Sequence, residues 1–186
     1  VSYETILSSI PLPELIKIIP EAPKKVINAA NKLKTNSFFV VNIGVNRPNI
    51  TDKNWIYFLE REFSFVRVSF PFNQSDNVCP DGTSSISAEI SYGHDNLLPT
   101  SREKLTERVI KDLIKADILE ESDEIIYLDT VDIKYAYVIF DNERKAAIKI
   151  IHDYLKIFDI IPFGRYGMWA YLWSDEAMLS GKKVAE

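Results

Sequence analysis

The residues best suited to chemistry form one short run near the C-terminal end, from Gly164 to Asp175. Two glycines three positions apart flank an arginine, and the run ends where a helix is expected to begin. Glycines let a backbone come close to a phosphate or a flat ring, and a helix start offers unpaired N–H groups and the positive end of the helix dipole. The candidate contact residues are Gly164, Arg165, Tyr166, Gly167, Trp169, Tyr171, Trp173, Ser174 and Asp175. They predict a segment that contacts a flat ligand; the alternative is an aromatic-rich loop that packs on its own sheet.

The helix expected from Ser174 to the end of the chain carries small residues on one face. These are Ala177, Ser180, Gly181 and Val184. A glycine inside a helix costs about 1 kcal/mol relative to alanine, so its presence there favours close packing against another element.

Composition excludes several classes of protein and of partner. The 186 residues are 46% hydrophobic and 26% charged, which is ordinary for a globular domain. The net charge is −5 with basic and acidic residues interleaved, which argues against nucleic acid as a partner. One cysteine, Cys79, and two histidines give no metal-ligand set and no intrachain disulfide. No stretch approaches the roughly 18 apolar residues of a membrane span, so we expect a cytoplasmic protein.

Hydrophobic periodicity predicts five helices and eight strands. The helices are expected over 13–19, 23–33, 100–116, 142–158 and 174–186, with Thr100 and Glu103 forming a capping box. The strands are expected over 6–10, 38–45, 55–59, 65–70, 83–92, 124–128, 131–139 and 160–162, with 55–59 and 65–70 pairing as a hairpin. Helices grouped at either end of a strand-rich middle predict an α+β fold with a mostly antiparallel sheet.

One histidine needs a separate interpretation. His152 shares the polar face of the 142–158 helix with Lys145, Lys149 and Lys156. That position predicts a solvated histidine rather than a catalytic one.

The run GRYGMWAYLWSDEAMLSGKKVAE resembles the C-terminal flavin-binding segment of a large FAD-dependent family, which includes amine oxidases, protoporphyrinogen oxidases and UDP-galactopyranose mutases. Two other stretches agree in order: residues 1–12 look like the family's return strand into the substrate domain, and residues 135–140 are similar to a family strand that carries an aromatic residue. The chain thus resembles the C-terminal half of such a protein. Because it opens on Val1 in a strand-like run, we expect a fragment of a longer polypeptide.

The resemblance implies the organisation of the chain. A mixed, mostly antiparallel sheet flanked by helices would form a substrate-binding domain over 13–139. Residues 1–12 and 140–186 would be pieces of an incomplete FAD-binding α/β domain. The fold class is accordingly α+β.

The resemblance also implies roles for residues. Gly164 and Arg165 would come near the FAD diphosphate and ribityl chain, and the helix start at Trp173 to Asp175 would face the pyrimidine edge of the flavin. A helix N-terminus there would stabilise the negative charge of a reduced flavin. On the substrate side the resemblance points to Arg67, Tyr135 and Tyr137; for Arg67 the alternative is an exposed structural arginine.

One departure from the family limits what the chain can do alone. The six glycines contain no G-x-G-x-x-G, the motif that cradles the FAD diphosphate. The chain is therefore expected to be colourless and inactive alone, and to need a missing N-terminal half or a separate subunit that supplies the cradle. An exposed apolar patch of Ile6, Leu7, Ile160 and the last helix would dock that half and could drive self-association.

The predicted function is the substrate-binding and flavin-capping half of an FAD-dependent oxidoreductase of the amine oxidase or protoporphyrinogen oxidase type, acting on a small molecule. Two alternatives stay open: a fragment of a UDP-galactopyranose mutase-like sugar-nucleotide enzyme, and a stand-alone, non-catalytic binding or assembly module. No residue is an unambiguous base or nucleophile, so no catalytic residue is assigned.

Overall fold

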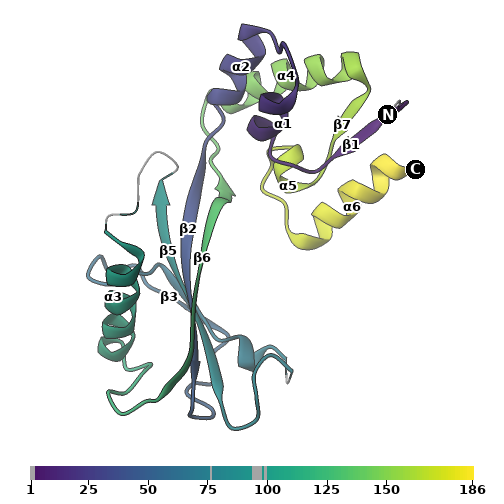
Figure 1. The fold of residues 1–186 in the computed structure, drawn as a ribbon. Helices are drawn as coiled ribbons and strands as arrows, with labels where there is room; N and C mark the ends of the chain where they lie inside the picture. The colour runs from purple at the N-terminus through teal and green to yellow at the C-terminus, as the bar shows by residue number, and fades with distance from the viewer. Residues whose placement is uncertain (1–2, 76, 94–97, 99) are drawn as a thin grey trace. The chain divides into compact units, whose positions relative to one another are not determined.

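The chain divides into two compact units, which are described separately. The computed structural model describes residues 3–75, 77–93, 98 and 100–186, so Val1 and Ser2 of the expected 1–12 segment lie outside it. The first unit comprises 1–35 and 137–186, and the second comprises 36–136 (Figure 1). The helices within 13–33 thus group with the C-terminal segment, and the assignment of substrate-binding and FAD-binding domains stays a prediction.

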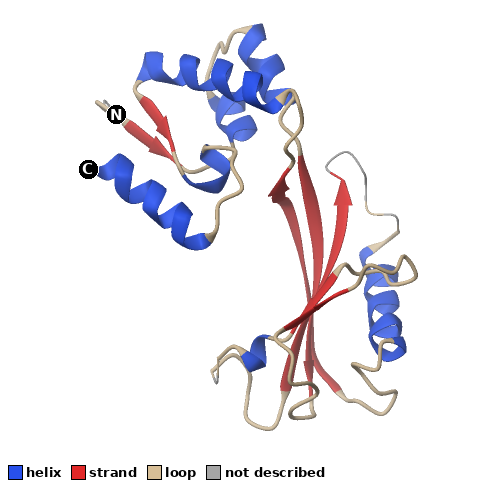
Figure 2. Ribbon diagram, turned by 180° about the vertical axis from the view of Figure 1, so that it is seen from behind, coloured by secondary structure: helices blue, strands red, loops and turns tan. Residues whose placement is uncertain are grey.

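The second unit is built on a five-stranded sheet in the order β3-β4-β5-β2-β6. Its long strands are shown in red in Figure 2. The strands are β2 (Thr35–Val45), β3 (Trp55–Tyr57), β4 (Arg67–Ser69), β5 (Ser84–Gly93) and β6 (Ile125–Val138), with a 3₁₀ turn η1 (Pro71–Asn73). The β3–β4, β4–β5 and β2–β5 pairs are antiparallel. The expected α+β class, the hairpin and the internal position of the 38–45 strand are therefore confirmed.

One helix, α3 (Arg102–Lys115), covers one face of this sheet. Phe39, Val41 and Ile43 alternate along β2 and enter one core with residues of the helix. Leu105, Val109 and Leu113 supply the helical side of that core. The N-cap is Ser101, whose hydroxyl accepts the Lys104 N–H, so the expected cap at Thr100 is wrong by one residue.

The last strand of the sheet differs from the prediction. The sequence suggested separate strands over 124–128 and 131–139, but β6 runs unbroken from Ile125 to Val138. Asp129 and Thr130 interrupt the apolar pattern without breaking the strand, because neither glycine nor proline lies between the two segments.

Among its described residues, the first unit holds a two-stranded parallel sheet and five α-helices. β1 (Ile6–Ser8) pairs with β7 (Ile160–Pro162). The helices are α1 (Leu12–Ile18), α2 (Lys24–Asn31), α4 (Arg144–Leu155), α5 (Gly164–Gly167) and α6 (Ser174–Ala185). The expected 142–158 helix is shorter: α4 ends at Leu155 and a 3₁₀ turn, η2 (Lys156–Phe158), follows before Asp159 takes a left-handed conformation.

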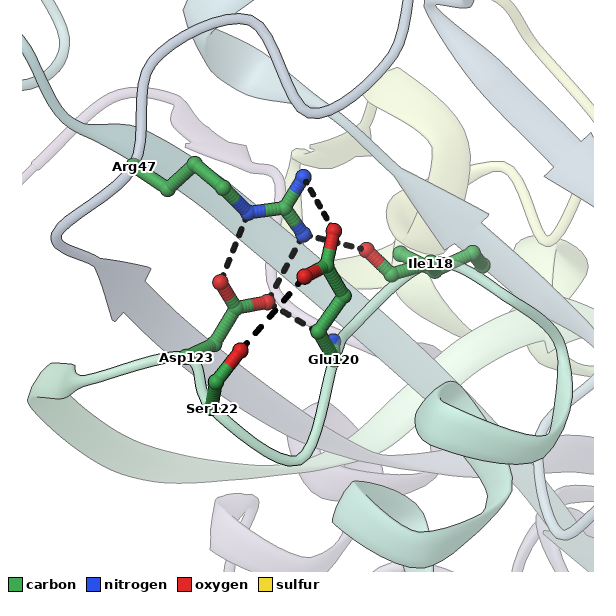
Figure 3. A network of polar contacts seen from close by, with 5 residues as sticks. All are labelled: Arg47, Ile118, Glu120, Ser122 and Asp123. Carbon is green, nitrogen blue, oxygen red and sulfur yellow. Dashed lines mark hydrogen bonds and ion pairs between the residues drawn. The ribbon is translucent and has the colours of Figure 1, made fainter.

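A partly buried charge pair stabilises the end of the second unit's sheet (Figure 3). Arg47 Nε and Nη2 donate to the two carboxylate oxygens of Asp123 at 2.6 and 2.7 Å, and the Asp123 side chain is 5% exposed. Asp123 also accepts the Glu120 N–H, and Arg47 Nη1 lies 3.5 Å from the Glu120 carboxylate. The pair joins the segment after β2 to the turn before β6. The hydrogen bonds from Arg47 are the largest cause of the lowered pKa of Asp123.

We expect Arg47→Gln to lower the free energy of unfolding by about 1.5–3 kcal/mol at neutral pH, because it leaves a nearly buried carboxylate short of its charged partner. Since the folded-state pKa of Asp123 is lowered, its contribution exists above the ordinary pKa of aspartate and is lost as pH falls through the lowered value. Urea unfolding of wild type and variant at neutral and strongly acidic pH measures this. The difference should shrink in acid; a difference that stays constant would contradict the assignment.

Candidate functional site

The glycine- and aromatic-rich run lies in the first unit, where it forms α5 and the connection to α6 (Figure 1). Gly164 has a φ of +71°, a conformation that favours glycine. Its N–H donates to Ser180 Oγ at 2.8 Å, and the N–H of Phe163 donates to the Ser8 carbonyl at 2.9 Å. The start of the run is therefore anchored to both β1 and α6.

Gly167 is required for packing within the chain. A Cβ atom built there would lie 2.7 Å from the Ser8 carbonyl oxygen, closer than a methyl group can come to a backbone atom. The close approach that the sequence suggested thus exists, but the group that approaches Gly167 is the end of β1.

Trp169 forms part of the core of this unit. Its side chain is fully buried and its φ is +49°. Its carbonyl accepts hydrogen bonds from the Arg144 guanidinium, one of them from Nε at 2.8 Å. Trp169 therefore anchors the run through its buried side chain and through its carbonyl group.

Three of the predicted residues form one cluster. The rings of Tyr137 and Tyr171 stack with centroids 5.5 Å apart, and the Arg165 guanidinium carbon lies 5.2 and 4.7 Å from them. Such cation–π contacts hold an arginine in one orientation. Within the described residues, Arg165 Nε is buried and has no hydrogen-bond partner. Tyr166, next to it, is half-buried.

The start of α6 presents the exposed part of the run. Trp173 is 71% exposed, and Ser174 and Asp175 are exposed as well. Sequence reasoning missed Glu176, whose carboxylate accepts the Trp173 N–H at 2.8 Å. Its position in the first helical turn was the available signal. If the negatively charged edge of a flavin lay at this helix start, it would lie beside the carboxylates of Asp175 and Glu176.

The expected packing face of α6 is confirmed. Ala177, Ser180, Gly181 and Val184 are the partly buried positions of the helix. A Cβ on Gly181 would lie 3.3 Å from the ring of Phe163, so the small residue lets α6 pack closely on the segment that precedes α5.

Two predicted substrate residues, Arg67 and Tyr135, belong to the second unit. Arg67 stands opposite Glu89 in the β4–β5 register and donates from Nε and Nη2 to its carboxylate at 3.0 and 2.5 Å. Its guanidinium carbon also lies 5.9 Å from the Tyr57 ring centre. A substrate phosphate would have to compete with Glu89. Tyr135 is half-buried, with the Lys134 ammonium 5.1 Å from its ring centre.

The prediction that His152 is solvated is wrong. The side chain is partly buried, its imidazole hydrogen bonds the Gly167 backbone, and Nε2 is buried without a hydrogen-bond partner among the described residues. Desolvation lowers the pKa of His152, and the hydrogen bond to Gly167 opposes that shift. Helical periodicity could not reveal this, because the covering segment lies beyond the helix.

Two structural features are absent from the part of the chain that the structure describes. None of its helices has the length and apolar character needed to cross a bilayer. Nor do its His, Cys, Asp and Glu side chains gather in any group of three or more that could hold a metal ion.

Comparison with solved structures shows what this fold is similar to. Reduced UDP-galactopyranose mutase matches with a TM-score of 0.81 and 25% identity, over 92% of this chain and 37% of that chain. A protein from Exiguobacterium sp. 255-15 assigned as a protoporphyrinogen oxidase matches with a TM-score of 0.68 and 15% identity, over 98% and 42%. Putrescine oxidase bound to putrescine matches with a TM-score of 0.64 and 14% identity, over 97% and 41%.

These neighbours are FAD-dependent, amine oxidase-like flavoproteins, so the resemblance seen in the sequence is confirmed as a resemblance in fold. No protein-family model matches the chain. The chain spans less than half the length of each of these three proteins.

Proposed function

We propose that this chain is the substrate-binding and flavin-capping portion of a larger FAD-dependent oxidoreductase of the amine oxidase or protoporphyrinogen oxidase type. The observation that carries the proposal is the match of nearly the whole chain to parts of two oxidases, the protein assigned as a protoporphyrinogen oxidase and putrescine oxidase. The rest of the enzyme would supply the glycine-rich cradle for the FAD diphosphate, which the six glycines here do not form.

The residues of the run fit one side of a flavin site. The exposed aromatics Tyr171 and Trp173, with Ser174 and Asp175 at the start of α6, supply flat surfaces and helix N–H groups. The buried, unpaired Nε of Arg165 could serve a ligand oxygen. Bound FAD would supply the redox chemistry, and these residues would orient the ring and exclude water from it. In this proposal Gly164, Tyr166, Gly167 and Trp169 shape the segment.

The first unit carries surface suited to a missing half. Parallel strands are normally covered on both faces, yet β1 and β7 form a two-stranded parallel sheet with Leu7 and Ile161 exposed. Met178 and Leu179 on α6 are exposed as well. Ile160, which we expected in this patch, is 6% exposed and belongs to the core instead. The patch supports docking of the remaining polypeptide.

The flavin content of two purified proteins tests the proposal. The 186-residue chain should be colourless after gel filtration, and the full-length polypeptide that carries it should retain flavin. A full-length protein that retains no flavin would contradict the proposal. Flavin that stays on the isolated chain would also contradict it, because tight binding would then not need a glycine-rich cradle from the rest of the enzyme.

A mutase-like sugar-nucleotide enzyme is the second candidate, because UDP-galactopyranose mutase gives a TM-score of 0.81 where the oxidases give 0.68 and 0.64. In that case the Arg67 guanidinium would leave the Glu89 carboxylate and bind a substrate phosphate. Titration of UDP into the full-length protein discriminates: a mutase-like site binds UDP, and Arg67→Lys weakens it about tenfold or more because the bidentate geometry is lost. Glu89→Gln should strengthen UDP binding by removing the competing carboxylate. Absence of UDP binding favours the oxidase type.

A further inference from the structure

A pocket of about 480 Å³ lies in the second unit, within the size range of small-molecule sites. Its floor is formed by β2, β5 and β6, and its wall by residues between Pro71 and Thr83. The floor residues 42–44 and 126–127 lie at the far end of the strands from the points where the chain leaves this unit, near residues 36 and 136. All residues that line the pocket belong to the second unit, whereas the run proposed to meet the flavin belongs to the first.

The floor lies on the face of the sheet opposite α3. Gly44 and Ser85 are register partners, so they point to the same face. Their neighbours Ile43 and Ile86 belong to the core that packs on α3, and side chains alternate along a strand. Gly44 and Ser85 therefore face the other way, into the pocket that Pro71 and residues 78–80 also line.

Gly44 keeps this floor open. It places no side chain next to Ser85, and a Cβ there would lie 2.9 Å from Tyr127 Cβ. The absence of a side chain at Gly44 both admits the close approach of Tyr127 and leaves the space above Ser85 empty.

One hydroxyl at the pocket has no hydrogen-bond partner within the described residues. Ser85 Oγ is buried and faces the pocket, whereas Ser84, the register partner of the core residue Val45, points to the α3 face. A buried hydroxyl without a hydrogen bond is destabilising, so Ser85 Oγ favours an occupant that carries a polar atom. The neighbouring Ser87 differs, since its hydroxyl donates to Asn42 Oδ1 at 2.8 Å.

The residues that line the pocket indicate which kind of ligand it can bind. None of the described residues that line the pocket is Lys, Arg, His, Asp or Glu, and most of the wall is apolar. The apolar members include Pro71, Val78, Pro80, Ile126 and Tyr127. A charged ligand would lose hydration there without gaining an ionic partner.

We propose that this pocket binds a small, neutral, mostly apolar molecule that hydrogen bonds Ser85 through one polar group. The inference does not depend on the flavin proposal. It excludes phosphates and nucleotides from this pocket.

The single cysteine of the chain gives a direct readout of occupancy. Cys79 lines the pocket, is half-buried, and its Sγ lies 3.6 Å from the Thr83 carbonyl oxygen. We use benzamide as the neutral probe and measure the rate of Cys79 alkylation by N-ethylmaleimide in the 186-residue chain. At about ten times its Kd, benzamide should slow alkylation about tenfold, and benzoate or benzylammonium at the same concentration should not.

Two serine variants on β5 test whether the protection of Cys79 arises at the pocket. Ser85→Val fills the space and removes the hydroxyl, so benzamide should no longer slow alkylation. Ser91→Val changes a serine on the same face of β5 outside the pocket and should behave as wild type. If Ser85→Val fails to fold, Ser85→Ala removes only the hydroxyl and should weaken protection.

Three results would overturn the proposal. The first is no slowing by benzamide up to its solubility limit, the outcome expected of a pocket that holds only water. The second is equal protection by benzoate. The third is protection that survives unchanged in the Ser85 variants.

Discussion

Replacing Gly167 by valine is expected to unfold or severely destabilise the first unit, with a loss of about 3 kcal/mol or more in the free energy of unfolding. The reason is a backbone clash: a Cβ would lie 2.7 Å from the Ser8 carbonyl oxygen, and the added branches of valine have no free volume in a buried turn. Because the obstructing atom belongs to the main chain at the end of β1, no rotamer change relieves it. Gly167→Ala should already cost about 1–3 kcal/mol.

Gly181→Ala is the matched control. Its new Cβ would meet the movable ring of Phe163 at 3.3 Å, and the gain of about 1 kcal/mol in helix propensity offsets the small displacement. Thermal and urea unfolding followed by circular dichroism compare the variants. A Gly167→Val protein that melts like wild type would show that α5 does not pack on the end of β1. This clash also means that flavin loss in Gly167→Val would report folding rather than contact with the ring.

The second large effect is expected at Trp173. If the start of α6 meets the flavin, Trp173→Ala in the full-length protein should weaken flavin retention about thirtyfold, which corresponds to the roughly 2 kcal/mol expected for a large aromatic surface buried against a ligand. The melting temperature of the flavin-free protein should change little, since the side chain is 71% exposed in this chain.

Trp55→Ala is the control for Trp173→Ala. Trp55 is also an exposed tryptophan, at 54%, but lies on β3 in the second unit. Flavin dissociation measured by the recovery of free-flavin fluorescence should be unchanged in Trp55→Ala. Equal retention in both variants would remove Trp173 from the flavin site.

The sequence predicted most of the elements because their signals are local. Alternation identified β5, proline and small residues marked α1 and α2, and the apolar run 160–162 matches β7 residue for residue. The cap of α3 was misplaced by one residue because Thr100 and Ser101 both carry a hydroxyl that can accept a hydrogen bond from the N–H groups of a helix start, and only the chain path decides between them.

The contacts that decide the site depend on register and on chain reversals, which periodicity does not give. Arg67 faces Glu89 only because β4 and β5 pair in one register, and that pairing makes the guanidinium less available than an exposed arginine. His152 is partly buried rather than solvated, because Gly167 lies against α4 and its backbone hydrogen bonds the imidazole. Gly167 was correctly predicted to allow a close approach, but the group that approaches it is the Ser8 carbonyl and not a ligand.

The central claim, that residues 164–176 cap a flavin, is tested most directly by amide hydrogen exchange of the full-length protein with and without FAD. We expect slower exchange on FAD binding in peptides from this segment. Exchange should be unchanged in peptides from 116–124, which include Asp123, the partner of Arg47 in the second unit. If FAD binds and exchange in residues 164–176 stays the same, the segment is an aromatic-rich packing loop and the flavin assignment is wrong.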